Sequence, residues 1–131
     1  MKFIANLPAQ SAGGATSVTL LGEFGREDGT GFGVTRVSVT SPAAVTGAAT
    51  NNFTLNVRQL RAGTPVGTVA SFTAAAGANL VVEVPRVLLD IDTNPGTGVS
   101  LNVGDVLDVQ LVQNGSGLAV PAGVNVTVTV N

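Results

Sequence analysis

The stretch from residue 104 to residue 130, GDVLDVQLVQNGSGLAVPAGVNVTVTV, alternates apolar and polar side chains with a period of two. In its first half Leu107, Val109 and Leu111 share one parity, while Asp108 and Gln110 share the other. In its second half four valines alternate with Asn and Thr up to residue 130. Successive side chains of a strand point to opposite faces, so the pattern predicts two strands, each with one buried and one wet face.

The rest of the chain repeats this pattern in short pieces. Alternating runs separated by Gly, Pro, Asn and Asp turns are expected at residues 16–24, 34–40, 53–60, 66–73, 80–84, 86–92 and 99–103, before the final pair. About eight or nine short strands at regular spacing predict an all-β antiparallel sandwich or barrel. No segment has helical periodicity over three turns.

Composition agrees with a turn-rich all-β chain. Hydrophobic residues make up 44% and charged residues 11%, with 17 Gly and 6 Pro among 131 residues. This length predicts one domain with a single core. We expect residues 1–15 to form an N-terminal arm with a flexible hinge at 12–15, and residues 16–131 to form the sandwich.

Charge and targeting signals narrow the range of partners. The net charge of −2 and the scattered Lys and Arg residues argue against nucleic acid. The opening MKFIANLPAQSA lacks the apolar run of a signal peptide, and no stretch approaches the roughly 18 apolar residues of a membrane span. We therefore expect a soluble protein without a membrane partner. The Gly-rich run at 29–33 lacks the Gly-Lys-Ser/Thr ending of a phosphate loop, and no cofactor is predicted.

Catalysis would fall to carboxylates, because the chain has no His, Cys or Tyr, and its one lysine is Lys2. Asp90 and Asp92 share a strand parity, and Asp105 and Asp108 flank a turn. Paired carboxylates can hydrolyse glycosides, but Trp and Tyr platforms for sugar are missing. These aspartates are predicted to lie at solvated positions, in a protein that is not an enzyme.

A metal site is the second chemical hypothesis. Asp90, Asp92 and Asn94 match the front half of a calcium loop, D-x-D-x-N. The EF-hand pattern then requires Gly and an acidic residue where this chain has Pro95 and Leu101. A looser calcium site in a β loop stays open beside the simpler interpretation, a strand that enters an Asn-Pro-Gly turn.

Apolar residues on outward registers predict a protein contact surface. On this alternation the strand residues that point outward are Leu21, Val81, Leu88 and Val112, and the apolar residues of the arm are Phe3, Ile4 and Leu7. Two alternatives stay open: the arm covers these side chains, or the register differs from the one assumed.

Several stretches resemble a group of small tailed-phage proteins that decorate the exterior of the capsid. They are residues 37–57, VSVTSPAAVTGAATNNFTLNV, residues 67–73, GTVASFT, residues 77–80, GANL, and residues 103–128, VGDVLDVQLVQNGSGLAVPAGVNVTV. The likeness is one of loops and strands and does not extend to the first 32 residues.

The resemblance implies a jelly roll or related β-sandwich that binds the assembled shell of the major capsid protein as a decoration, or cement, protein. Such proteins are made in the bacterial cytoplasm and sit on the outer surface of the virion, most often as trimers and otherwise as dimers at local symmetry axes. Two alternatives remain: a carbohydrate- or receptor-binding head of a virion fibre, and a self-assembling shell subunit that polymerises through residues 124–130 as an edge strand.

Overall fold

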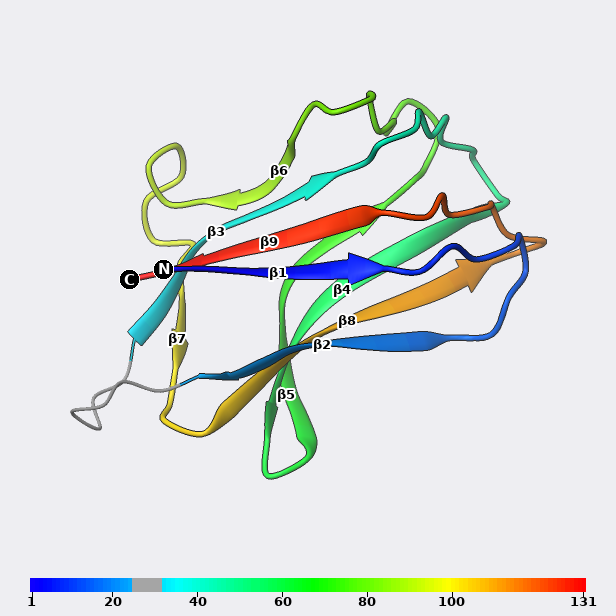
Figure 1. The fold of residues 1–131 in the computed structure, drawn as a ribbon. Coiled ribbons are helices and arrows are strands. Elements are labelled where there is room, and N and C mark those ends of the chain that lie inside the picture. Colours follow the sequence, from blue (N-terminus) through cyan, green and yellow to red (C-terminus); the bar gives the residue numbers. More distant parts are fainter. Residues whose placement is uncertain (25–31) are drawn as a thin grey trace.

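The computed structural model describes residues 1–24 and 32–131, which form nine strands and no helix (Figure 1). The strands are β1 (Lys2–Leu7), β2 (Ser17–Phe24), β3 (Phe32–Thr40), β4 (Asn52–Arg61), β5 (Thr64–Thr73), β6 (Arg86–Asp90), β7 (Val99–Leu101), β8 (Asp105–Asn114) and β9 (Val124–Val130). A helix that could cross a membrane is therefore absent from these residues. Residues 29–31 of the Gly-rich run lie outside them.

The strands form two antiparallel sheets, which confirms the predicted all-β sandwich. The first sheet has the order β1-β9-β3-β6, with β7 also paired to β3, and the second has the order β2-β8-β4-β5. Pairing is nested along the chain: β1 pairs with β9, β2 with β8, β3 with β6 and β7, and β4 with β5. Both edge strands of each sheet lie near an edge strand of the other, β1 near β2 and β5 near β6.

The core lies between the sheets and follows the predicted alternation where the strands are regular. The inward residues Leu107, Val109 and Leu111 of β8 and the four valines of β9 are all buried. Strand β9 lies between β1 and β3, with hydrogen-bonded neighbours on both sides. The expectation that residues 124–130 form a polymerising edge is therefore wrong, since the edge of this sheet is β1.

The N-terminal segment is part of the sandwich, and the expected arm is wrong for its first half. Strand β1 pairs with β9 over six consecutive residues. Ala5 and Leu7 are buried, and the ring centroid of Phe3 lies 4.4 Å from that of Phe24. The alternation of Phe3, Ala5 and Leu7 supplies an inward face, which makes this segment a strand.

A β-bulge reverses the predicted register of β2. Pairing with β8 shifts between Leu20 and Gly22, and Gly22 has a φ of 138°, in a region that L side chains rarely adopt. The shift leaves Val18 and Leu20 on the outer face, 51% and 69% exposed, and turns Leu21 towards the core. The alternation that places Leu21 outward also places Val18 and Leu20 in the core, and both predictions are wrong.

The predicted strand at residues 80–84 is also wrong. Leu80 is buried and bridges to Val45, but the three valines that follow it closely (Val81, Val82 and Val84) are exposed. The segment turns at Glu83, which has a φ of 58°. In β6 the pairing with β3 shifts, so that Leu88 is the extra residue and packs partly against the core.

Candidate interaction surface

The residues proposed for calcium form a closed turn at the end of β6. The Asp92 N–H donates to Asp90 Oδ1 at 3.0 Å, and the Asn94 N–H donates to the Asp90 carbonyl at 2.9 Å. Asp90 also lies 3.9 Å from the guanidinium of Arg36. Within residues 1–24 and 32–131, no three His, Cys, Asp or Glu side chains come together in a group that could hold a metal ion.

Asp105 is buried, contrary to the expectation of a solvated turn residue. Arg61 donates to its two oxygens from Nε and Nη2, both at 2.9 Å. Gln59 Nε2 at 2.6 Å and the Asn102 N–H at 2.9 Å complete its partners. The hydrogen-bonded Arg61 guanidinium, helped by Asn102 and Gln59, holds the pKa of this carboxyl well below its usual range. Asp105 therefore closes one end of the sandwich as a structural anion.

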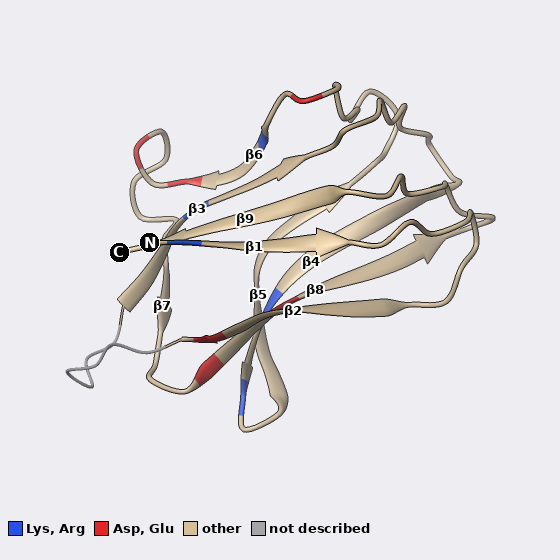
Figure 2. Ribbon diagram, viewed as in Figure 1, with Lys and Arg blue, Asp and Glu red and all other residues tan. Residues whose placement is uncertain are grey.

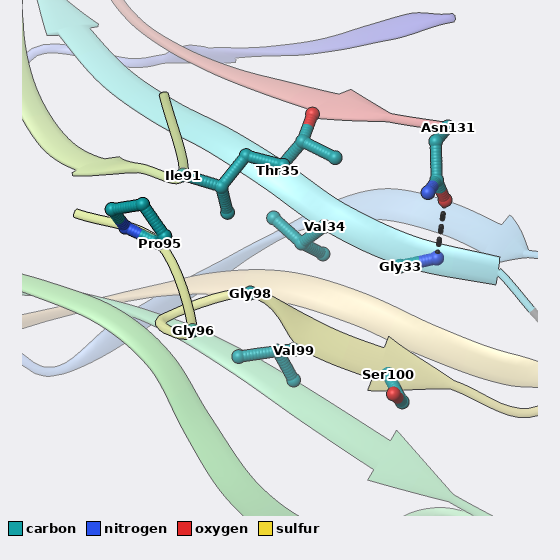
Figure 3. A pocket seen from close by; sticks show the side chains of 10 residues that line it. All are labelled: Gly33, Val34, Thr35, Ile91, Pro95, Gly96, Gly98, Val99, Ser100 and Asn131. Atoms are coloured by element: carbon teal, nitrogen blue, oxygen red, sulfur yellow. Dashed lines mark hydrogen bonds between the residues drawn. The ribbon is translucent and has the colours of Figure 1, made fainter. Parts of the chain in front are cut away.

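A hollow of about 360 Å³ lies where β6 leaves β3 and β7 takes its place (Figure 3). Val34, Ile91, Pro95 and Val99 line it, and Asn131 closes one side by accepting a 2.7 Å hydrogen bond from the Gly33 N–H. Among the described residues that line it, none has a charged side chain. These residues offer shape and apolar contact.

The structure does not bring the predicted contact residues of the arm and strands together. Leu7 is buried, and three others (Phe3, Leu21 and Leu88) pack partly against the core. Ile4 remains exposed on the outer face of the first sheet, whereas Val112 is half-buried on the outer face of the second. The predicted single surface is therefore wrong, because the bulges in β2 and β6 change which side chains face outward.

Apolar side chains instead gather on the outer face of the second sheet. Residues paired across β2, β8 and β4 place Leu20 beside Asp108 and Arg58, and Val18 beside Gln110 and Asn56. The neighbouring rows add more apolar side chains. We call this surface the second-sheet face, and its apolar members are Val18, Leu20, Leu60, Val106 and Val112.

The ion pair at the centre of the second-sheet face is largely buried. Arg58 donates to both oxygens of Asp108, from Nε at 2.9 Å and from Nη2 at 2.8 Å. The side chains of Arg58 and Asp108 are only 19% and 3% exposed, although both point away from the core. The hydrogen bonds that the Arg58 guanidinium donates to Asp108 raise the pKa of Arg58. The two charges cancel at short range, so the centre of this face is neutral.

Uncharged polar residues on the same face bond to one another. Ser71 Oγ donates to Asn56 Oδ1 at 2.9 Å, and the hydroxyls of Thr54 and Thr73 lie 2.9 Å apart. Asn114 Nδ2 donates to Thr54 Oγ1 at 2.9 Å. Because these groups already have partners, a docking protein could cover them without leaving many of them unsatisfied.

The outer face of the first sheet has a different character. We call it the first-sheet face; it carries Lys2, Ile4, Asn6, Arg36, Ser38, Thr40, Val87, Asp90, Asn125, Thr127 and Thr129. Ile4 and Val87 are its only exposed large apolar side chains among the described residues, and they lie on opposite edge strands. This is the composition of a solvated sheet face.

The two ends of the sandwich differ in charge. The loops at residues 8–16, 41–51, 74–80 and 115–123 contain no charged residue, and Figure 2 shows this end without red or blue. Backbone bridges between Gln10 and Val120 and between Val45 and Leu80 tie these loops together. A hollow of about 350 Å³ lies there, lined by Val45, Leu118 and Pro121 among others. This uncharged end is a second region suited to protein contact.

Sequence reasoning missed the second-sheet face for two reasons. The bulge in β2 was not visible in the alternation, although Gly22 within a strand pattern is a recognised signal for one. The pairing of Arg58 with Asp108 joins residues 50 positions apart, and no local pattern encodes it.

No protein-family model matches the chain, and no curated protein or solved structure was found to be significantly similar to it.

Proposed function

We propose that this protein is a capsid decoration protein, which binds the outside of an assembled phage shell through its second-sheet face and stabilises the shell. The observation that carries the proposal is the pairing of exposed apolar side chains, Val18 and Leu20, with a sealed neutral ion pair on one sheet face. The likeness of residues 37–57 and 103–128 to phage decoration proteins supports the choice of partner, the major capsid protein.

We also propose that the sandwich is a jelly roll. The nested pairing of β1 with β9, β2 with β8, β3 with β6 and β7, and β4 with β5 supports this, with β6 and β7 together serving as one interrupted strand. Two four-stranded layers wound in this way form a rigid block. A rigid block loses little conformational entropy on docking, which favours binding to a stiff lattice.

The chemistry of the second-sheet face fits a protein surface better than a sugar or a small molecule. Interface cores are depleted of free charges and include Arg among their enriched residues. The chain has no Trp or Tyr with which to stack a sugar ring. Its aspartates at 90, 105 and 108 are held by arginines, in roles that require no catalysis.

The proposal is tested by mixing purified protein with shells of the encoding virus that lack it, followed by co-sedimentation. Leu20→Glu should weaken binding roughly 10–100-fold, because it places a charge in a desolvated contact. Leu20 is 69% exposed, so the thermal unfolding of the free variant should stay close to that of the parent.

Two matched variants control for position. Val87→Glu places the same charge on an exposed valine of the first-sheet face, and Ala119→Glu places it on the uncharged end. Both should bind shells like the parent. Loss of binding in Ala119→Glu alone would move the docking site to the uncharged end, and binding by none of the proteins, parent included, would refute the decoration role.

A further inference from the structure

We infer that two copies of this chain pair through β1, edge to edge, in an antiparallel fashion about a two-fold axis at Ile4. The partner is a second copy of the same strand, which would extend the first sheet across both molecules. The inference rests on the geometry of the sheet edges and is independent of any contact with a shell.

Among the described residues, β1 is the only edge strand of at least five residues that is regular along its whole length. Strands β2 and β6 each carry a bulge, and the pairing of β5 with β4 shifts twice. Proline also interrupts β5 at Pro65 and precedes β6 at Pro85. Bulges and prolines are the devices that keep a sheet edge from pairing with another chain. Strand β1 has neither, over six residues in unbroken register with β9.

The backbone groups that β1 leaves free can be assigned from its pairing with β9. Met1 and Val130 exchange two hydrogen bonds, at 3.0 and 2.8 Å, and the Leu7 carbonyl also bonds on the β9 side. Hydrogen-bonded and non-bonded pairs alternate in an antiparallel ladder, so the odd residues of β1 face β9. The N–H and C=O groups of Lys2, Ile4 and Asn6 therefore point to the open edge.

These three residues fix the register of a self-pairing. Placing Ile4 opposite Ile4 of the second copy also puts Lys2 opposite Asn6, in both directions. All three residues then become hydrogen-bonded pairs, which satisfies every free group of the strand. A shift of two residues in either direction loses one of these pairs, and in one direction it brings Pro8, which has no N–H, opposite Lys2.

The side chains agree with this register. Residues directly opposite share a face, so the inward face of β1 continues into the inward face of its copy. Ile4, 62% exposed in the single chain, meets its own copy as a β-branched cross-strand pair. Phe3 lies opposite the small Ala5. Lys2 lies opposite the neutral Asn6, so the two lysines do not face each other.

The two-fold axis of such a pair is perpendicular to the sheet. Both second-sheet faces therefore point the same way and could rest on one surface, which doubles the contact made by each particle. This geometry favours a dimer over the trimer that the resemblance to phage decoration proteins implies.

The mass of the pure protein in solution tests the pairing, by light scattering or sedimentation. The parent chain is expected to be a dimer. Ile4→Pro removes an N–H that points to the open edge and leaves the ladder to β9 intact, so the variant should be a folded monomer. Ile4→Lys, which sets two like charges opposite each other, should also be a monomer, whereas Val87→Lys on the far edge should remain a dimer.

Cysteine substitution tests the register, since the chain has no cysteine of its own. Under mild oxidation Ile4→Cys should form a disulfide with its own copy, because hydrogen-bonded pairs lie about 5.5 Å apart at Cα, within disulfide range. Lys2→Cys and Asn6→Cys should each remain single chains but cross-link when mixed. A monomeric parent, or a dimer that persists in both Ile4→Pro and Ile4→Lys, would overturn the inference.

Discussion

The outer faces of the two sheets each carry one arginine–aspartate pair, and the two pairs are built differently. On the first-sheet face Arg36 and Asp90 are 3.9 Å apart, and their side chains are 44% and 23% exposed. On the second-sheet face Arg58 and Asp108 are joined by two hydrogen bonds and are 19% and 3% exposed. The first pair is loose and hydrated, whereas the second is fixed and sealed.

The contrast shows how a sheet can prepare one of its faces for contact. Covering a loosely paired charge would require stripping its water, which is costly. The Arg58–Asp108 pair has already lost most of its water when the chain folds, and apolar Leu20 lies beside it. Docking on the second-sheet face would therefore add little further desolvation of charge.

Asp105 is the most buried of the paired carboxylates in residues 1–24 and 32–131, and its loss should reduce stability most. Asp105→Ala should lower the free energy of unfolding by about 3 kcal/mol, because the buried Gln59 amide and the Asn102 N–H lose their acceptor. Urea unfolding of the parent and the variant at pH 7 measures this. A loss below about 1 kcal/mol would contradict the assigned role.

Alanine substitution of Arg36 and Arg58 tests whether the two arginine–aspartate pairs differ in their contribution to stability. Arg58→Ala leaves Asp108 without its partner on a largely covered site, and should cost about 2 kcal/mol. Arg36→Ala removes a loose, exposed partner and should cost less than about 0.5 kcal/mol. Equal losses in the two variants would show that the faces do not differ in the way we describe.

The pH dependence of stability tests the role of Asp105 in a second way. The pKa of Asp105 is lowered in the folded chain, so its contribution to stability is fully present above the unfolded pKa of roughly 3.9 and declines as the pH falls towards the folded pKa. The urea midpoint of the parent should decrease as the pH is lowered from 5 to 2. Asp105→Asn should be less stable at pH 7 but should show a flatter dependence over this range; a parallel fall in the two proteins would contradict the assignment.

Substitution of Glu83 should change the free energy of unfolding least. Its φ of 58° is unfavourable for a side chain with a Cβ, and glycine adopts this conformation freely. Glu83→Gly should therefore raise the unfolding free energy by up to about 0.5 kcal/mol, part of the gain being offset by the greater entropy of the unfolded chain. Thermal unfolding measures this. Gly67→Ala is the control, because Gly67 has open space around it and no positive φ.

The sequence predicted those parts of the fold that depend on alternation alone. The predicted strand at residues 124–130 and the predicted inward residues of β8 are correct, because both strands are regular and have one buried face. The register of β2 was wrong because one extra residue at the Leu20–Gly22 bulge exchanges the faces of the strand. The sequence predicts an arm at residues 1–15, because a short strand next to a Gly-rich loop does not show with which sheet it pairs.

The second-sheet face was harder to predict, because it is formed by residues that are neighbours in space and distant in the sequence. Polar parity correctly placed Asp108 on an outer face, but the predicted solvated position is wrong. Asp108 is buried and paired with Arg58, which lies 50 residues earlier in the chain. Val18 and Leu20 become a surface only once β2 takes its place beside β8. The burial of Asp108 and the surface formed by Val18 and Leu20 both depend on which strands pair. Period-two patterns do not determine that pairing.

We propose that the second-sheet face docks on a viral shell, and electron cryo-microscopy of shells mixed with the protein shows whether it does. We predict ordered density on the outer surface, with Val18, Leu20 and Val112 against the shell and Thr127 and Thr129 of the first-sheet face towards solvent. Shells without ordered density, or density in which the first-sheet face or the uncharged end makes the contact, would contradict the account.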